Sequence, residues 1–391
     1  KLITHPLLFL LHNPSTHARR IMSRTVLKSS TSAGDVVFEG ERFWCKTPAE
    51  ARMMLAREGV AVLVGVLDAD EIQGMQEGMW ETLSSMTAPF ARPVVRGEPA
   101  TYGTVRSLMP NHGYLFQGWP GLAHRQHIWD VRQNPKVAGA FAEIWGCGAE
   151  ELLCSFDAVS MGVAHLAEGG GTGWERGHKW EHMDQAPTRV GFECVQGWVT
   201  GEDIEPGDAT LLVRPGSHRL GPGLVEKFGI TETKDWYKLK VEERAWFAEQ
   251  GCEDLRILAP AGSLVLWDSR TVHSGSNPMK EAVRHKPRNV IYVCMQPRLP
   301  TVKGMGAGTE KRRASTKEMQ VLARALKKRR EIFDPTNEAK FLRMTTHWPR
   351  KTLLFGKYPR SYGPKPAEWE QVPKGETPTL TALGRKLAGL D

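Results

Sequence analysis

Five short apolar stretches place the strongest constraint on what this chain can fold into. They cover residues 152–163, 189–199, 209–213, 263–267 and 290–295. Turn-forming glycine and proline separate them, as in Glu205-Pro206-Gly207-Asp208 and Ala259-Pro260-Ala261-Gly262. Short strands at this spacing are typical of a sandwich or jelly roll. The sequence therefore predicts a mainly β core.

Helices are predicted before these strands. Thr47 is a suitable N-cap residue with Pro48 at the first helical position, and Gly59 follows the last apolar position. Asp68 can cap a second helix, in which apolar residues recur every three or four positions. Asn134 opens a third helix in the same way. These helices are expected to flank the β core.

His182-Met183-Asp184 is the first motif that carries chemistry. On a strand, alternate residues point to the same face, so His182 and Asp184 project together while Met183 points away. His273 lies far along the chain, beside another predicted strand, and is the expected third ligand. Two imidazoles and one carboxylate on one side of a metal form the facial triad that suits non-haem Fe(II).

A zinc hydrolase is the remote alternative. His178-Lys179-Trp180-Glu181-His182 spells H-x-x-E-H, the inverted zinc-protease signature. That chemistry needs one helix, so that the two histidines lie a turn apart. Gly169-Gly170-Gly171 precedes the motif and Pro187 follows it, which argues against a helix there.

Taken in order, the motifs between residues 152 and 298 resemble those of the phytanoyl-CoA dioxygenase family of Fe(II)/2-oxoglutarate oxygenases. The matching pieces are His182-Met183-Asp184, Gln196-Gly197-Trp198-Val199, Gly207-Asp208, Arg214-Pro215-Gly216-Ser217-His218, Gly262 to Asp268, His273 and Arg288. Each piece is weakly specific, and their order makes the resemblance strong. The predicted helix and strand at 47–85 also look like the family's usual N-terminal elements. With them the resemblance covers about two-thirds of the chain, and the segment after about residue 301 has no counterpart in the family.

The resemblance implies a double-stranded β-helix (jelly roll, cupin-like) with flanking helices. It implies Fe(II) held by His182, Asp184 and His273, with 2-oxoglutarate and O2 as cosubstrates. The implied reaction hydroxylates a C–H bond and releases succinate and CO2, with desaturation or ring formation left open. A small-molecule or carrier-linked substrate is expected first, and nucleic acid or protein second.

The resemblance also implies residues that bind 2-oxoglutarate. Its far carboxylate should pair with an arginine, whose planar fork matches a carboxylate. Arg288 opens the last predicted strand and is preferred, because a strand holds a side chain better than a loop. Arg284 is the alternative. Trp198 is expected to line the pocket, and Ser274 could reach the cosubstrate, although the family's serine falls one position later, at Gly275.

Further polar and aromatic residues adjoin these motifs or lie in the N-terminal part. They are candidates for contacting the substrate or supporting the metal ligands: Gln117, Asp157, Trp180, Gln185, Asp268 and Arg270. Asp268 and Arg270 lie two positions apart, so an extended strand would place them on one face.

Charge and cysteine usage bear on partners and compartment. The formal net charge is +8, which favours anionic partners, and Lys327-Lys328-Arg329-Arg330 supports the nucleic-acid alternative. The apolar runs are too short for a membrane helix. Six cysteines without a C-x-x-C pair indicate reduced thiols in an intracellular protein.

Three regions are expected along the chain. Residues 1–40 are predicted to be a disordered or targeting segment. Residues 1–34 contain no Asp or Glu and several basic residues, as in an organellar transit peptide; without targeting, the protein would be cytoplasmic. Residues 41–300 form the oxygenase domain, with an insertion at about 220–254 that is expected to be a lid or binding loop. Residues 301–391 are expected to form a basic helix at 309–333 and a Pro- and aromatic-rich extension packed on the core.

Overall fold

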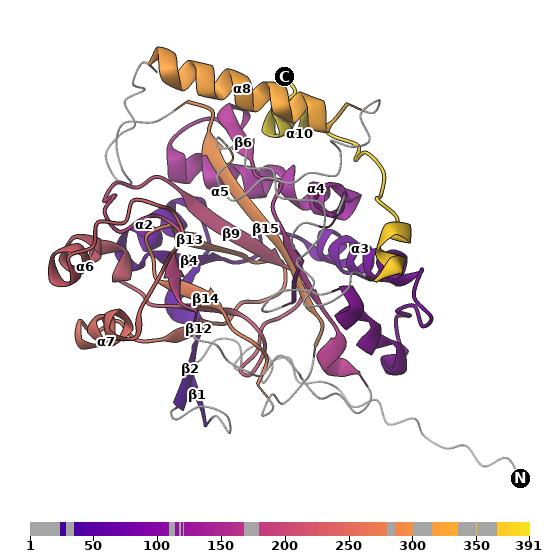
Figure 1. Cartoon of the computed structure of the whole chain (residues 1–391), viewed down its shortest axis with the longest axis horizontal. Helices are drawn as coiled ribbons and strands as arrows, with labels where there is room; N and C mark the ends of the chain where they lie inside the picture. The colour runs from indigo at the N-terminus through magenta and orange to yellow at the C-terminus, as the bar shows by residue number, and fades with distance from the viewer. Residues whose placement is uncertain are drawn as a thin grey trace, which may run out of the picture.

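The computed structural model describes residues 24–28, 35–108, 114–116, 119, 121–167, 180–279, 286–299, 315–334, 349 and 366–391. Two β-sheets form the centre of the molecule, and helices lie outside them (Figure 1). The chain also forms 3-10 helices at Glu41–Phe43, Pro99–Leu108, Leu122–His124, Ala149–Glu151, Ala164–Leu166, Ser217–Arg219 and Ala367–Gln371.

Each sheet has its own strand order. The sheet here called the major sheet runs β3 (Trp44–Cys45), β4 (Val60–Leu63), β13 (Leu264–Asp268), β9 (Val195–Thr200), β15 (Arg288–Pro297), β7 (Val159–Gly162) and β5 (Leu115–Phe116), with β6 (Leu152–Cys154) also paired to β15. The minor sheet runs β1 (Thr25–Lys28), β2 (Asp35–Glu39), β12 (Leu255–Ile257), β10 (Leu211–Val213), β14 (His273–Gly275), β8 (His182–Met183) and β11 (Tyr237–Lys238).

Four neighbouring strands from each sheet together form the barrel. The major sheet contributes β13-β9-β15-β7 and the minor sheet contributes β12-β10-β14-β8, all in antiparallel pairs. From β7 to β15 the chain passes repeatedly from one sheet to the other, which is the winding of a double-stranded β-helix. The predicted fold class is confirmed.

The space between the sheets is filled mainly by apolar side chains. Trp198, Val265 and Val290 of the major sheet belong to one buried cluster with residues of β10 and β12. None of the six cysteines, all of which the structure describes, forms a disulfide, and the sulfur atoms of Cys194 and Cys294 lie 3.4 Å apart. Because side chains alternate along a strand, each central strand of the major sheet has an inner face toward the barrel and an outer face toward the helices.

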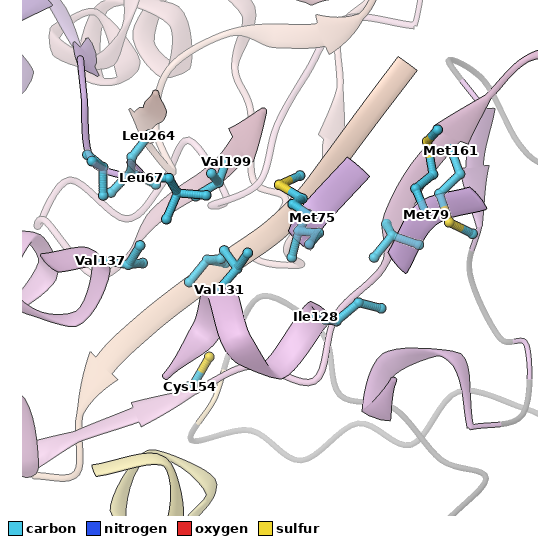
Figure 2. Packing of buried hydrophobic residues seen from close by; sticks show 14 of the residues in the cluster. Leu67, Met75, Met79, Ile128, Val131, Val137, Cys154, Met161, Val199 and Leu264 are labelled. Atoms are coloured by element: carbon cyan, nitrogen blue, oxygen red, sulfur yellow. The ribbon is translucent and has the colours of Figure 1, made fainter. Parts of the chain in front are cut away.

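The outer face of the major sheet is covered by helices. They are α2 (Pro48–Glu58), α3 (Ala69–Thr87), α4 (Gln126–Arg132) and α5 (Pro135–Trp145). Figure 2 shows Met75 and Met79 of α3 in the cluster that also holds Met161, Val199 and Leu264. Burying these side chains contributes roughly 1.5–3 kcal/mol each, which fixes the helices against the sheet.

The predicted helix ends are confirmed. Thr47 accepts a hydrogen bond from the backbone of Glu50, and Gly59 ends α2 in the left-handed conformation at φ 77°. Asp68 forms a reciprocal capping box with Glu71 at the start of α3. The side chain of Asn134 caps α5. Short polar side chains satisfy the free N–H groups of each first turn.

Two strands differ from their predicted extents. The stretch 152–163 is split into β6 and β7, because the two parts pair with opposite ends of β15. The stretch 189–199 becomes a strand only at Val195. The side chain of Gln185 bonds the carbonyls of Arg189 and Gly191, so this part of the backbone forms a turn instead of a ladder.

The prediction of a disordered or targeting segment through residue 40 is wrong for residues 25–28 and 35–39, which form two strands. Thr25–Lys28 and Asp35–Glu39 pair as β1 and β2, and β2 pairs in parallel with β12. Phe38 is fully buried in the barrel cluster, with Leu27 packed against that cluster. A composition argument based on missing acidic residues overlooked these apolar anchors. Residues 1–23 lie outside the described residues, so the transit peptide stays a prediction.

The insertion at 220–254 covers the outer face of the minor sheet. It forms α6 (Gly221–Phe228), the short strand β11 and α7 (Val241–Glu249), with both helices on one side of the molecule in Figure 1. Leu224 and Phe247 of its helices pack with Met183 and Val272, which alternate with His182 and His273 along their strands. Strand β11 lengthens the minor sheet beside β8.

The C-terminal region also contacts the core. Its helices are α8 (Thr316–Ile332) and α10 (Ala382–Ala388), which lie side by side in Figure 1. Arg329, inside the basic run of α8, is fully buried and donates hydrogen bonds to the carbonyls of Ala388 and Cys154. Trp369 is buried in the large cluster. Among the described residues, no helix is long and apolar enough to cross a membrane.

Candidate metal centre

The structure brings His182, Asp184 and His273 together. His182 in β8 is the direct antiparallel partner of His273 in β14, and Asp184 follows β8. Nε2 of His182 lies 3.4 Å from Oδ1 of Asp184, and Nε2 of His273 lies 3.2 Å from Oδ2. One ligand atom from each of the three residues lies within 4.8 Å of the others. Their exposed fractions are 4%, 3% and 5%, so the cluster is buried.

Backbone carbonyls fix the orientation of both imidazoles. Nδ1 of His182 lies 3.2 Å from the carbonyl oxygen of Trp180, and Nδ1 of His273 lies 2.9 Å from that of Thr271. Because a carbonyl oxygen only accepts, Nδ1 must carry the proton in each ring. The lone pair of each ring is therefore on Nε2, facing Asp184, as in metal-binding histidines.

The pKa of His182 also favours its neutral form. Burial lowers the pKa of His182, and the neighbouring His273 lowers it further. A neutral imidazole is the form that binds a metal ion. Two neutral imidazoles and one carboxylate are the donor set that suits non-haem Fe(II) and leaves coordination positions open for other ligands. These residues fit the metal that the sequence predicts.

Gln196 is a supporting residue that the sequence analysis did not identify. Its side-chain amide donates a hydrogen bond to Oδ2 of Asp184. Gln196 shares the inner face of β9 with Trp198, two positions later. That alternation was a usable signal, because Trp198 was already expected to face the site. Trp267 is the direct cross-strand partner of Gln196, and its ring lies 5.3 Å from the ring of His273.

Two tryptophans flank His182. The Trp180 ring stacks on the imidazole with a centroid distance of 5.0 Å and an interplanar angle of 17°. The Trp236 ring lies 5.4 Å from the same imidazole. Trp180 was a candidate from the sequence, whereas Trp236 comes from the insertion, where no motif signalled it. The metal cluster therefore has an aromatic wall on its His182 side.

Arg288 opens β15 and carries a buried guanidinium. It donates a hydrogen bond to the carbonyl of Ala209, while its Nε has no hydrogen-bond partner among the described residues. Burial lowers its pKa, and a side-chain hydrogen bond with Tyr292 partly offsets this. No carboxylate among the described residues forms an ion pair with Arg288. A buried guanidinium in this state is stabilised by an anionic ligand.

A second titratable group lies near Arg288. Asp208 is partly buried, and burial raises its pKa to about 7, although Lys286 and Arg288 oppose the shift. Asp208 accepts a hydrogen bond from the backbone of Glu205 at 2.8 Å. It lines the same small cavity of about 20 Å³ as Arg288. The charge near Arg288 therefore depends on pH in the neutral range.

Trp198 and Ser274 were also predicted to bind 2-oxoglutarate, and the structure places them on different faces of their strands. Trp198 is buried on the inner face of β9, directly opposite Tyr292 of β15. Ser274 lies between His273 and Gly275 on β14, and alternation points it to the opposite face from His273. The geometry therefore does not bring Ser274 to the metal cluster.

Four of the remaining candidates form supporting contacts. Asp268 is fully buried and forms an ion pair with Arg270 at 2.6 Å. They do not lie on one extended strand, since β13 ends at Asp268 and Arg270 bends back to it. Gln185 accepts a hydrogen bond from Ser269 at 2.9 Å. The side chain of Asp157 accepts a hydrogen bond from the next backbone N–H, in the loop between β6 and β7.

Three predicted residues, Gln117, His178 and Arg284, lie outside the described residues. The choice between Arg288 and Arg284 therefore stays open to experiment. The zinc-hydrolase alternative is wrong, because His182 lies in the strand β8 and not in the helix that H-x-x-E-H chemistry requires.

Two histidines and one carboxylate in one buried cluster of a double-stranded β-helix are the arrangement typical of Fe(II)- and 2-oxoglutarate-dependent oxygenases. The family described as phytanoyl-CoA dioxygenase (PhyH) matches residues 55–285, and the chain belongs to this family. The donor set of His182, Asp184 and His273 fits the Fe(II)- and 2-oxoglutarate-dependent chemistry of this family.

Individual relatives are more distant. A curated relative, the Ava biosynthesis cluster protein O of Aspergillus versicolor, is 30% identical over 186 residues; the match covers 46% of this chain and spans 56% of that protein's length. The solved structure of the epimerase SnoN with Fe3+, alpha ketoglutarate and nogalamycin RO is 16% identical, with a TM-score of 0.40, over 66% of this chain and 86% of that chain. EctD from S. alaskensis is 17% identical, with a TM-score of 0.42, over 66% and 80%.

Proposed function

We propose that the protein hydroxylates a C–H bond of a small molecule, with conversion of 2-oxoglutarate and O2 to succinate and CO2. In this proposal His182, Asp184 and His273 hold the iron, and Arg288 binds the far carboxylate of 2-oxoglutarate. The observation that carries it is the buried three-residue cluster with both Nε2 atoms directed at Asp184. Bound iron and 2-oxoglutarate would supply the activation of O2 and the oxidation of the substrate carbon.

The chain's own residues would prepare the site for this chemistry. The carbonyls of Trp180 and Thr271 hold the imidazoles in the tautomer that binds a metal. Gln196 fixes the rotamer of Asp184, which leaves its other oxygen for the metal. Such supporting hydrogen bonds position metal ligands and raise their basicity. The buried Arg288 would gain a charge partner when 2-oxoglutarate binds.

Burial of the cluster favours a small substrate. Its residues are at most 5% exposed, so a reacting carbon must enter a narrow site. The basic run on α8 gives weaker support to nucleic acid than the sequence suggested. Arg329 is buried there in contacts with Cys154 and Ala388, and cannot contact phosphates. Nucleic acid or protein remains the alternative substrate class.

The test is succinate formation by the full chain reconstituted anaerobically with Fe(II), then supplied with 2-oxoglutarate and O2. Slow formation of succinate without added substrate is expected in the wild type. Asp184→Ala should abolish it, whereas Asp70→Ala, a surface change on α3, should leave it unchanged. Equal rates in wild type and Asp184→Ala would refute the assignment of the metal site.

A further inference from the structure

Strand β11 of the insertion lies along the metal-binding strand. Lys238 is the direct antiparallel partner of His182. One residue pair further on, the backbone N–H of Trp236 donates a 2.9 Å hydrogen bond to the carbonyl of Asp184. Two metal-ligand positions therefore each face a residue of the insertion across this edge of the minor sheet.

Strand alternation decides which of these side chains face the metal. Tyr237 is paired with Met183 and packs with it in the apolar cluster on the outer face of the sheet. The next strand residue, Lys238, must then project to the inner face, on the same side as His182. The ring distance of 5.4 Å between Trp236 and His182 places the Trp236 indole beside the same imidazole.

Trp236 has two properties that a residue kept only for stability would not combine. Its φ is 65°, a left-handed conformation that is rare for a bulky residue and costs about 1–2 kcal/mol. Its side chain is 53% exposed, so burial does not repay that cost. Residues held in a strained backbone conformation cluster at active sites and ligand-binding segments.

Trp180 adds a second indole on the same face. It alternates with His182 and Asp184 along the chain and stacks on the His182 ring. A Cβ at Gly275 would lie 3.5 Å from the indole carbon Cζ2 of Trp180, so the indole lies against the bare backbone of β14. Two indoles next to one metal ligand form a surface that favours flat, conjugated molecules.

Lys238 brings a positive charge to this surface. Its side chain is exposed, and it forms no ion pair with any carboxylate in the part of the chain that the structure describes. Glu181, the nearest acidic residue in sequence to the triad, is paired instead with Arg244 at 3.7 Å. A cation without a partner beside an aromatic surface can pair with an acidic group on a bound ring.

We propose that Trp236, Trp180 and Lys238 select the substrate, and that this substrate presents a planar conjugated ring carrying an anionic group. The inference rests on the proposed function, because it takes the His182 cluster as the reacting centre. Trp236 would stack on the ring and Lys238 would pair with its anionic group. The insertion would then determine specificity rather than act only as a cover for the minor sheet.

The test measures binding of 1-naphthoate and its saturated analogue, decahydronaphthalene-1-carboxylate, to the full chain loaded with Mn(II) and 2-oxoglutarate. Calorimetry is suitable, and loading is measured first for every variant. The wild type should bind the aromatic acid at least tenfold more tightly than the saturated acid. Trp236→Leu, which keeps apolar bulk without a ring, should remove this preference, whereas Trp236→Phe should keep most of it.

The role of Lys238 needs a neutral probe as well. Lys238→Ala should weaken binding of 1-naphthoate by about threefold to tenfold and leave 1-naphthalenemethanol unaffected. Lys234→Ala, in the same segment, is the matched control and should change neither.

Trp236→Asn should unfold at the same or a higher urea concentration than wild type, because asparagine tolerates a positive φ.

Three results would overturn the inference: equal binding of aromatic and saturated acids, unchanged binding in Trp236→Leu, or no measurable binding of 1-naphthoate to the loaded wild type at millimolar concentration. Failure of the wild type to load Mn(II) and 2-oxoglutarate at all is a different outcome. It would refute the proposed function itself, and the two failures are thereby distinguished.

Discussion

Gln196 on β9 donates its side-chain amide to Asp184, so the two sheets of the barrel meet through a hydrogen bond at the metal cluster. The carboxylate is held by the major sheet, while the histidines are held by carbonyls beside the minor sheet. The geometry of the cluster thus depends on how the two sheets pack.

The first prediction concerns this hydrogen bond. Gln196→Leu keeps the approximate volume but removes the donor, so Asp184 should lose its fixed rotamer. We expect affinity for Mn(II) or Fe(II) to fall by about 10–100-fold, the usual effect of removing a partner of a metal ligand. Metal titration followed by calorimetry measures this. Gln73→Leu, on the exposed face of α3, is the control and should bind metal like the wild type.

The second prediction concerns Arg288. Arg288→Lys keeps a charge but loses the planar fork, and Arg288→Gln loses the charge as well. We expect the KM for 2-oxoglutarate to rise at least about tenfold in the lysine variant and further in the glutamine variant. The exposed Arg92→Lys serves as the control. An unchanged KM in both Arg288 variants would move the assignment to Arg284, the alternative from the sequence.

The third prediction concerns pH. The pKa of Asp208 is about 7 in the folded protein and near the ordinary value of 3.8 when unfolded. Between these values the folded state binds a proton that the unfolded chain has lost, so this group makes stability fall as pH rises from about 4 to 7. Asp208→Asn should flatten that slope in urea unfolding at pH 5 and pH 8. A slope equal to that of wild type, or of the surface variant Asp70→Asn, would contradict it.

The fourth prediction concerns the C-terminal region. Arg329 donates to the carbonyls of Ala388, Cys154 and Pro349 and lies 4.5 Å from the Phe156 ring centroid. Arg329→Met fills similar space but leaves buried carbonyls without donors. We expect a loss of about 2–4 kcal/mol in the free energy of unfolding.

The next residue provides a matched control for that experiment. Arg330 lies on the exposed side of the same helix, so Arg330→Met should change the free energy of unfolding by less than about 0.5 kcal/mol. Urea titration followed by circular dichroism measures both variants. Similar losses in the two variants would mean that Arg329 acts only through the net charge of α8.

Much of the fold could be predicted because its signals are local. The caps at Thr47, Asp68 and Asn134 depend on a few neighbouring residues, and strand alternation alone puts His182 and Asp184 on one face. The pairing of His182 with His273 is not local. It could be expected only from the order of motifs along the chain. In the structure, the register between β8 and β14 places the two histidines directly opposite each other.

Other features had no local signal. The contact between Gln196 and Asp184 joins different sheets, and β1 is held by pairing with β2 rather than by its own composition. Trp236 reaches the cluster because β11 pairs with β8, although its segment carries no recognisable motif. Pairings of this kind depend on the whole fold, so single-sequence patterns miss them.

The burial of α10 affects how this protein can be made. Leu387 and Ala388 belong to buried clusters that also include residues of β6, α4 and α8. Those clusters stay open during synthesis until residues 382–388 have left the ribosome. The barrel can wind earlier, but it must remain soluble with part of its apolar surface uncovered. We therefore expect chaperone dependence during translation to be greatest just before α10 emerges.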